Sequence, residues 1–354
     1  MIKQTFKARV SLLILGLVGA NLLASCSGAS NTATDTATAP AEGEAADAGE
    51  ACAPELAALD FGIISTESQE NLKSLWEPFL EVMEAEIGRE VNGFYATDYA
   101  GVIEAMGANK VQLAWYGGKS YIEAAARSNA EAFAQTVAED GSKGYYAHLI
   151  TNKENPIVSE IDLEAGNGDE YVVENAADLT FAFNDPNSTS GFLVPTYYVF
   201  AQKGADPNQI FSELIFAGSH EATAQAVAEN QVDVATNNNE SLTRLGESDP
   251  EALERIQIIW TSPIIPSDPL AYRNDLPDCL KEDIQNFFFN LDDEEVLTPL
   301  GWSGFDPAGD EDWNTIRELE IAKNILEVQN DDTLSDADKQ QQIDELNQQL
   351  EALN

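Results

Sequence analysis

Three consecutive hydroxyl residues, Ser188, Thr189 and Ser190, stand in the segment DPNSTSGF at residues 185–192. The segment lies between a predicted strand, residues 179–183, and a predicted helix. The first turn of a helix has N–H groups without intrahelical partners and carries the positive end of the helix dipole, so it binds an oxyanion without a cationic side chain. The pattern predicts an anion site, and the alternative is an ordinary turn in which one serine caps the helix.

Proline limits how that helix can begin. Pro195 falls early in it, and proline spares a backbone N–H only within the first turn. We therefore expect the helix either to start a little after Ser190 or to bend at Pro195. The sequence does not decide which backbone N–H groups would face an anion.

The sequence excludes two other kinds of chemistry. The GKS at residues 118–120 has the end of a phosphate-binding P-loop, but Leu113 stands where that motif requires glycine. The chain has two histidines, His148 and His220, and neither stands in a spacing with Cys or a carboxylate that builds a zinc site. No catalytic metal and no cofactor is predicted.

One enzymatic alternative stays open. The sequence has no Gly-x-Ser-x-Gly elbow. A triad of Ser188, His220 and Asp268 can nevertheless be assembled, and such triads recur on unrelated folds. A Ser-dependent hydrolase that uses Ser188 and His220 is therefore the enzymatic alternative.

Short predicted strands alternate with predicted helices, which is typical of α/β layers. Alternating or continuous apolar runs predict the strands, and apolar residues at helical spacing, in some cases behind a Ser, Thr or Asp cap, predict the helices. The predicted strands are 58–64, 90–95, 111–116, 179–183, 213–216, 232–236 and 256–261. The predicted helices are 68–87, 99–106, 119–127, 220–229 and 277–290. The polar stretch 152–175 is predicted to be a linker with an insertion.

Two further helices, 316–328 and 335–353, are predicted at the C-terminus. In the second, Ile343, Leu346, Leu350 and Leu353 repeat at spacings of three, four and three on a Gln-rich, acidic background. This stripe is too narrow for a core helix, so we expect it to dock on the body of the protein or on a second subunit.

The N-terminus has the pattern of a bacterial export signal. Three basic residues precede an apolar run, and the run ends in Leu-Ala-Ser-Cys at residues 23–26. This is the lipobox pattern, which predicts a signal peptide at 1–25 and lipidation of Cys26. The run is shorter than the roughly 20 residues that a membrane span requires. Residues 26–54 are mostly small and acidic, which predicts a disordered tether.

The chain is strongly acidic, with 62 Asp and Glu against 18 Lys and Arg, a net charge of −44. Such a surface repels nucleic acid and anionic lipid, so no nucleic-acid partner is expected and the membrane is reached only through the N-terminal lipid. We interpret the acidity as a sign of a saline habitat. Two further cysteines, Cys52 and Cys279, can pair in an exported chain, but the sequence does not decide whether they do.

Several segments in order resemble the phosphonate-binding proteins of ABC transporters. The resemblance runs from about residue 60 to the C-terminal helices. It rests on FGIISTESQ at 61–69, ATDYAG at 96–101, AWYG at 114–117, DPNSTSGFLVP at 185–195, VDVATNN at 232–238 and SPIIPSDP at 262–269.

This resemblance implies a type II periplasmic-binding-protein fold, in which two α/β lobes joined by two crossovers close on a ligand. Lobe 1 would comprise residues 56–150 plus 262–310, and lobe 2 residues 151–261. Residues 311–354 would form C-terminal helices, through which the family often pairs, so a homodimer is possible. The segment 163–175 looks longer than the family's usual connection, which leaves its role open.

The resemblance also implies a set of ligand contacts. The phosphonate oxygens would meet Ser188, Thr189 and Ser190, the phenols of Tyr99 and Tyr145, and the imidazole of His220. The amino end of the ligand would meet the carboxylates of Glu240 and Asp268. Each residue has a plainer alternative, namely a cap, a packed aromatic ring or a solvated carboxylate.

A donor-rich end and a carboxylate-rich end suit a zwitterion, since the two carboxylates attract an ammonium group and repel an anionic tail. The sequence therefore predicts a periplasmic, lipid-anchored binding protein that delivers an alkylphosphonate to an ABC permease, with 2-aminoethylphosphonate as the expected ligand. A binder of phosphite, methylphosphonate or phosphate is the alternative within the same class. A ligand sensor that signals through its C-terminal helices is a third possible function.

Overall fold

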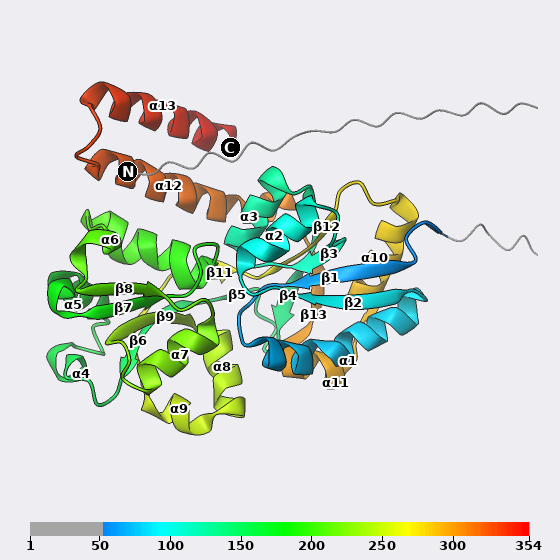
Figure 1. Ribbon diagram of the computed structural model, residues 1–354, viewed down its shortest axis with the longest axis horizontal. Helices are drawn as coiled ribbons and strands as arrows, with labels where there is room; N and C mark the ends of the chain where they lie inside the picture. The colour runs from blue at the N-terminus through cyan, green and yellow to red at the C-terminus, as the bar shows by residue number, and fades with distance from the viewer. Residues whose placement is uncertain (1–51, 354) are drawn as a thin grey trace, which may run out of the picture. The chain divides into compact units, whose positions relative to one another are not determined.

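Two mixed β-sheets organise the chain in the computed structural model, which describes residues 52–353 (Figure 1). The six-stranded sheet has the order β13-β4-β12-β3-β1-β2, and the five-stranded sheet has the order β10-β6-β9-β7-β8. We call each sheet with its helices a lobe. The signal peptide at 1–25, lipidation of Cys26 and most of the tether at 26–54 lie outside the described residues.

Lobe 1 contains the six-stranded sheet. Strands β2 and β3 pair with β1 in parallel, whereas β12 and β13 add antiparallel pairs, so the chain returns to this sheet from its C-terminal half. The strands are β1 (Ala58–Ile63), β2 (Glu90–Tyr95), β3 (Leu113–Trp115), β4 (Ala130–Ala138), β12 (Pro269–Arg273) and β13 (Trp302–Pro307). The helices are α1 (Gln69–Ile87), α2 (Tyr99–Gly107), α3 (Gly118–Arg127), α10 (Asp278–Asn290) and α11 (Glu294–Leu297).

Local signals set the helix boundaries in lobe 1. The side chain of Ser68 accepts a hydrogen bond from the Asn71 N–H and begins α1, and Gly88 ends it in the left-handed conformation. Asp98 caps α2 by accepting from the Gly101 N–H at 2.7 Å. These helices were predicted from the sequence and are confirmed.

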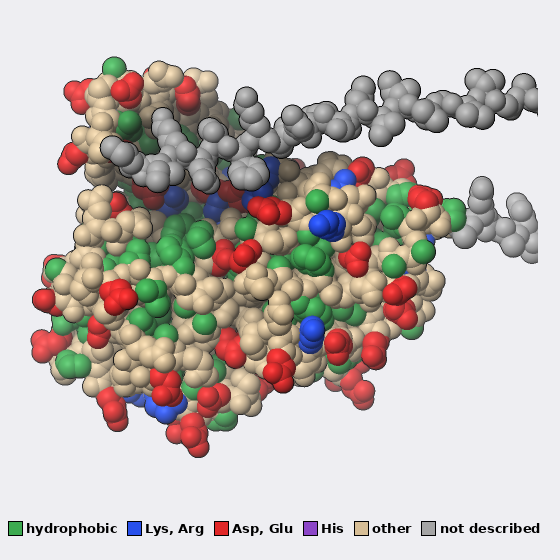
Figure 2. Space-filling model, in the orientation of Figure 1, with side chains coloured by type: hydrophobic (Ala, Val, Ile, Leu, Met, Phe, Trp, Pro, Cys, Tyr) green, Lys and Arg blue, Asp and Glu red, His purple; other side chains and the backbone are tan. Residues whose placement is uncertain are grey.

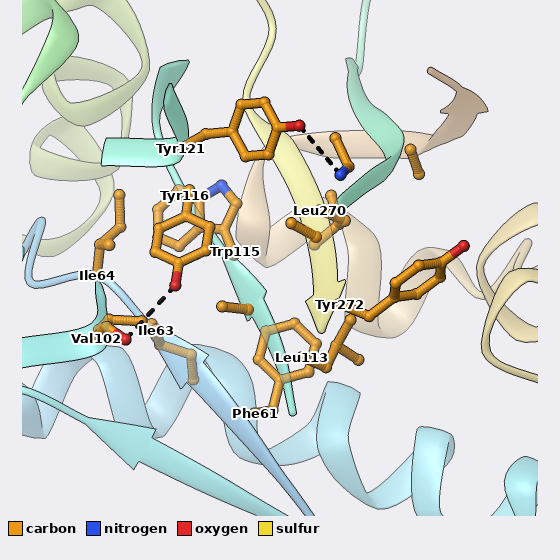
Figure 3. Packing of buried hydrophobic residues seen from close by; sticks show 14 of the residues in the cluster. Phe61, Ile63, Ile64, Val102, Leu113, Trp115, Tyr116, Tyr121, Leu270 and Tyr272 are labelled. Atoms are coloured by element: carbon orange, nitrogen blue, oxygen red, sulfur yellow. Dashed lines mark hydrogen bonds between the residues drawn. The ribbon is translucent and has the colours of Figure 1, made fainter. Parts of the chain in front are cut away.

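Aromatic and aliphatic side chains fill the core of lobe 1. Phe61, Trp115 and Tyr272 belong to this core, and Figure 3 shows them around β1, β3 and β12. The Tyr121 hydroxyl accepts a hydrogen bond from the backbone N–H of Ala132 at 3.2 Å, which joins α3 to β4 (Figure 3). The strand ends that carry site residues are therefore held by a rigid core.

Lobe 2 contains the five-stranded sheet, in which β8 and β9 flank β7 in parallel. The strands are β6 (Ala147–Asn152), β7 (Thr180–Phe183), β8 (Glu213–Phe216), β9 (Val234–Asn238) and β10 (Ile256–Thr261). The helices are α4 (Ile157–Glu160), α5 (Gly168–Glu174), α6 (Pro207–Ile210), α7 (His220–Ala228), α8 (Asn239–Ser248) and α9 (Pro250–Arg255). Two π-helical segments, η2 (Thr189–Leu193) and η3 (Thr196–Phe200), follow β7.

Two short strands, β5 (Gly144–Tyr145) and β11 (Ile265–Pro266), pair with each other where the chain passes between the sheets. Because β6 begins at Ala147, the chain changes sheets slightly before the boundary predicted at 150–151. The described chain forms one compact unit, so the division into two mobile lobes stays a prediction.

The stretch 152–175 is folded, so the prediction of a linker there is wrong. It carries the short helices α4 and α5, and it buries Ile157 and Val172 in the core of lobe 2. One buried apolar residue in each helix gives too weak a periodicity to recognise in a polar sequence.

The end of the predicted tether is fixed to the body. Cys52 forms a disulfide with Cys279 at the start of α10, with a Cα–Cα distance of 6.0 Å. The guanidinium of Arg89 also donates hydrogen bonds to the carbonyl oxygens of Cys52 (2.6 Å) and Ala53 (3.1 Å). Disorder therefore does not extend to residue 54, and the pairing that the sequence left open is present.

The C-terminal helices form a hairpin of α12 (Asn314–Asn330) and α13 (Asp336–Ala352). α12 contacts α3 of lobe 1 as well as η3 and η4 (Ala201–Lys203) of lobe 2. α13 packs on α12, and the residues of its apolar stripe are partly buried, whereas most of its other residues are exposed. The stripe therefore docks on the same chain.

Acidic side chains outnumber basic ones on the face shown in Figure 2. Among residues 52–353, no helix is both long enough and apolar enough to cross a bilayer.

Candidate functional site

The hydroxyl run lies after the turn that follows β7 and opens the first π-helical segment. Ser188 is the cap, because its Oγ accepts from the backbone N–H of Gly191 at 3.0 Å. The N–H of Leu193 donates to the Ser188 carbonyl at 3.1 Å, five residues back, which makes the turn wider than an α-helical one. The helix therefore starts before Ser190, which rules out the first of the two expected alternatives, a later start. The second, a bend at Pro195, stays a prediction, and Pro195 lies between two π-helical segments.

This turn requires glycine at position 191. A Cβ atom there would lie 2.4 Å from the Cβ of Asn184, closer than real atoms approach. The Gly191 carbonyl accepts from the Thr236 hydroxyl at 2.8 Å and from the Asn184 N–H at 3.2 Å. The ends of β7 and β9 thus hold the hydroxyl run, and Ser188, Thr189 and Ser190 are each at most 2% exposed.

His220 lies beside the third hydroxyl of the run. Asn238 Nδ2 lies 3.1 Å from Ser190 Oγ and 3.2 Å from His220 Nε2, and Ser190 Oγ lies 3.4 Å from the same Nε2. An amide N–H can only donate, so Nε2 is the acceptor and a neutral ring carries its proton on Nδ1. His220 Nδ1 is buried and has no hydrogen-bond partner among the described residues, so it is a free donor.

Burial keeps this imidazole neutral. Desolvation, together with the nearby charge of Arg244, lowers the pKa of His220 to about 3. A neutral ring donates one hydrogen bond to an oxyanion without adding a full positive charge.

Both predicted tyrosines face the same cavity. Tyr99 is the first residue of α2 and is 2% exposed, and its hydroxyl lies 3.4 Å from Asn184 Nδ2. Tyr145 lies in β5, where the chain passes between the sheets, and is 4% exposed. Burial first, and then nearby carboxylates, raise the pKa of each phenol well above its usual value. Both phenols keep their protons and can donate.

The two predicted carboxylates lie in the same cavity. Glu240 is in the first turn of α8, after the Asn238 cap, and Asp268 is in the loop between β11 and β12. Burial first, and then the charge of Glu240, raise the pKa of Asp268 well above its usual value. Burial also raises the pKa of Glu240. Asp268 Oδ1 is buried without a hydrogen-bond partner among the described residues.

All eight predicted ligand residues therefore line one cavity between the lobes, with about 20 Å³ of free space, little more than one water molecule needs. Roomier grooves, such as one of about 540 Å³ between α1 and α10, contain none of these residues. The lobes meet across the site: the Lys119 N–H of lobe 1 donates to Thr189 Oγ1 at 2.9 Å, and the Tyr99 N–H donates to Asp185 Oδ2 at 3.3 Å. A cavity of this size has no room for a phosphonate, so binding one there would require the lobes to separate.

Sequence reasoning missed four polar or aromatic residues of this cavity: Thr66, Trp115, Asn238 and Arg244. Three of them stand in the segments that carry the family resemblance, so the signal was present but not used. Arg244 stands outside those segments, but it follows Glu240 by four positions on α8, a spacing that brings two side chains to one helix face.

The hydrolase alternative does not fit this geometry. The imidazole of His220 contacts Ser190 and Asn238 rather than Ser188, whose oxygen is engaged as a helix cap. A pKa of about 3 also makes His220 too weak a base to activate a serine. Among residues 52–353, no cluster of His, Cys, Asp or Glu has the arrangement of a metal site.

Comparison with known proteins agrees with the site. Residues 61–313 match the family described as "ABC transporter, phosphonate, periplasmic substrate-binding protein". The phosphonates-binding periplasmic protein of Escherichia coli K12 is 47% identical over 301 residues, which cover 84% of this chain and 86% of that protein.

Solved structures share the fold. A binding protein component of a phosphonate ABC transporter from Pseudomonas aeruginosa is 44% identical, with a TM-score of 0.79 over 84% of this chain and 96% of that one. A Prochlorococcus marinus protein in complex with methylphosphonate is 21% identical, with a TM-score of 0.66 over 76% and 98%. The predicted two-lobed type II fold is thereby confirmed. The members of this family are transporter components rather than enzymes. This chain belongs to the family, the periplasmic substrate-binding proteins of phosphonate ABC transporters.

Proposed function

We propose that this protein captures an alkylphosphonate carrying an amino group, with 2-aminoethylphosphonate as the ligand, and delivers it to an ABC permease. Ser188, Thr189, Ser190, Tyr99, Tyr145 and His220 would donate to the phosphonate oxygens. Glu240 and Asp268 would accept from the ammonium group.

The pair of acidic side chains in the cavity carries this proposal. Like-charged carboxylates in one buried site are unfavourable unless a cation or a proton neutralises them. Burial raises the pKa of both side chains, and the charge of Glu240 raises that of Asp268 further. Arg244 is the only cationic side chain among the described residues that line the cavity, and its guanidinium is bonded to Glu67. An ammonium group at the amine end would supply the missing positive charge.

The end of the cavity that carries the hydrogen-bond donors suits the anionic part of the proposed ligand. It combines hydroxyl groups with the start of η2, where backbone N–H groups lack intrahelical partners, whereas the first N–H groups of α7 are already bonded to the Thr66 carbonyl. Phosphonate oxygens accept short charge-assisted hydrogen bonds from such donors. Methylphosphonate, phosphite and phosphate would use this end equally well but leave the carboxylates unpaired.

Titration calorimetry with these four ligands tests the proposal. We expect 2-aminoethylphosphonate to bind the wild-type protein at least tenfold more tightly than the others, because one charged hydrogen bond contributes about 1.5–3 kcal/mol. Glu240→Gln should weaken 2-aminoethylphosphonate about tenfold or more and change methylphosphonate less than twofold. Equal losses on both ligands, or tightest binding of phosphite or phosphate, would refute the amine site.

Two proposals concern attachment and assembly. Lipidation of Cys26 would anchor the protein to a membrane, and Cys26→Ser should move it from the detergent phase to the aqueous phase in phase partitioning. A homodimer through the C-terminal helices should sediment at twice the monomer mass. Since the stripe of α13 packs on α12, such a dimer would need other faces of the hairpin.

A further inference from the structure

The loop between β1 and α1 bonds to the start of α7 across the cavity. The Thr66 carbonyl of lobe 1 accepts from the N–H groups of His220 (2.9 Å) and Glu221 (3.2 Å) of lobe 2. In the other direction, the carboxylate of Glu221 accepts from the Ser68 N–H at 2.6 Å and from Asn71 Nδ2 at 3.1 Å. Each lobe thus supplies acceptors to N–H groups at the start of a helix in the other lobe.

This reciprocal capping stabilises the contact between the two lobes. The N–H groups at a helix start have no acceptor within their own helix, and a carboxylate there also gains from the helix dipole. These bonds can exist only while the two lobes are in contact. Opening the cavity would return these N–H groups, and the carboxylate of Glu221, to water.

An ion pair joins the lobes at the same place. Nε of Arg244 in α8 donates to Glu67 Oε1 at 2.5 Å, and the two side chains are 14% and 10% exposed. Nη2 of Arg244 also donates to Ser241 Oγ at 3.1 Å, which orients the guanidinium along its own helix. Glu67 stands between Thr66 and Ser68, so the loop before α1 and the first turn of α1, which contains Asn71, make all of these contacts.

The same two helices of lobe 2 carry proposed ligand residues. His220 stands next to Glu221 on α7, and Glu240 stands one turn before Arg244 on α8. Glu67 and Glu221 do not line the cavity, so they cannot act on the ligand by contact. Closing the lobes brings the ligand groups into place and forms these bonds in one movement.

We propose that Glu67, Glu221 and Arg244 form an interlobe latch that stabilises the closed state and so sets the affinity for every ligand of this cavity. Glu67 and Glu221 are positioning residues, whereas Arg244, which Glu67 helps to hold in place, also lines the cavity. Observed affinity is the intrinsic affinity multiplied by the fraction of protein that is closed, so weakening the latch weakens all ligands by a common factor. The latch rests on the cavity being the ligand site and does not depend on which phosphonate binds.

The test uses the full-length protein and the variants Glu67→Gln and Glu221→Ala. The matched control is Glu229→Gln, since Glu229 pairs with Arg255 within lobe 2 on the surface, with side chains 53% and 45% exposed. Dissociation constants and dissociation rates are measured for 2-aminoethylphosphonate and methylphosphonate. Binding stoichiometry gives the folded fraction of each variant.

We expect each latch variant to bind both ligands about tenfold more weakly, mostly through faster dissociation, while the ratio between the two ligands stays unchanged. The control should stay within twofold of wild type. Unchanged affinities in both latch variants would overturn the proposal. A loss confined to 2-aminoethylphosphonate would overturn it too, because it would make these residues part of the amine site.

Small-angle X-ray scattering of the ligand-free proteins is a readout independent of the ligand. The latch variants should have a larger radius of gyration than wild type and the control. If wild type bound neither phosphonate, the proposed function would fail, and scattering would still decide on the latch. Equal radii in all four proteins would overturn it.

Discussion

Replacing Asp268 by asparagine should separate the stability of this protein from its ligand preference. The substitution keeps the shape of the side chain and removes its negative charge. Asp268 is 8% exposed, and its carboxylate interacts with the charge of Glu240. Because burial raises the pKa of Asp268, its ionised form destabilises the ligand-free fold at neutral pH. Asparagine relieves that cost but loses the charge that would meet the ammonium group.

The sign of the pH dependence follows from the raised pKa. The usual pKa of an aspartate is about 4. At a pH well below that value the carboxyl is protonated in both the folded and unfolded states, so the cost vanishes. Above it, the unfolded state ionises freely and the folded state does not. Asp268→Asn should therefore raise the ligand-free Tm at pH 7, by about 2 °C for each 1 kcal/mol gained, and the gain should shrink toward pH 4.

The same variant should bind 2-aminoethylphosphonate more weakly by about tenfold to a hundredfold, the equivalent of one charged hydrogen bond of about 1.5–3 kcal/mol. Methylphosphonate should change less than threefold. Thermal unfolding at pH 7 and pH 4, with calorimetry for both ligands, measures all four quantities. A lower Tm at pH 7, or equal affinity losses for both ligands, would show that Asp268 is a structural residue rather than an amine ligand.

Three further outcomes are expected. The pKa of His220 in the folded state is about 3, against an ordinary value of 6.5, so the folded state resists protonation. The stability of the protein therefore falls as the pH drops from about 6.5. His220→Gln should flatten this decline, which is measured as the Tm. Reducing the Cys52–Cys279 disulfide, which spans 227 residues, should cost about 2–5 kcal/mol in denaturant unfolding without changing the closed site. Gly117→Ala should weaken every ligand severalfold in calorimetry, because its Cβ would press on Thr189 Oγ1 at 3.1 Å, whereas an unchanged affinity would show that Thr189 can retreat.

The sequence predicted best where a local signal decides the structure. Ser68, Asp98 and Ser219 each cap a helix whose start was predicted to within a residue, because capping involves only neighbouring residues. β4 (Ala130–Ala138) was missed, since its Ala-rich sequence has little strand propensity and it pairs with β12 and β13, far along the chain.

For the site, the residue types were predictable and their mutual contacts were not. The resemblance placed eight residues, and all of them line one cavity. That His220 contacts Ser190 rather than Ser188 depends on where β9 places Asn238. Arg244 was missed because its partner, Glu67, lies 177 positions away, a distance over which no spacing pattern operates.

If the cavity binds a phosphonate as proposed, the separation of charges within it is a physical reason for using neutral donors at the anionic end. A lysine or arginine beside the hydroxyl run would share a small cavity of low dielectric with Glu240 and Asp268, where opposite charges attract strongly. Such a cation would pair with these carboxylates and cancel the field that attracts an ammonium group. Hydroxyls, phenols, a neutral imidazole and helix starts hold oxyanions without that competition. Arg244 is the exception among the described residues that line the cavity. Its guanidinium is bonded to Glu67, and its charge offsets only part of the rise that burial produces in the pKa of Glu240 and of Asp268.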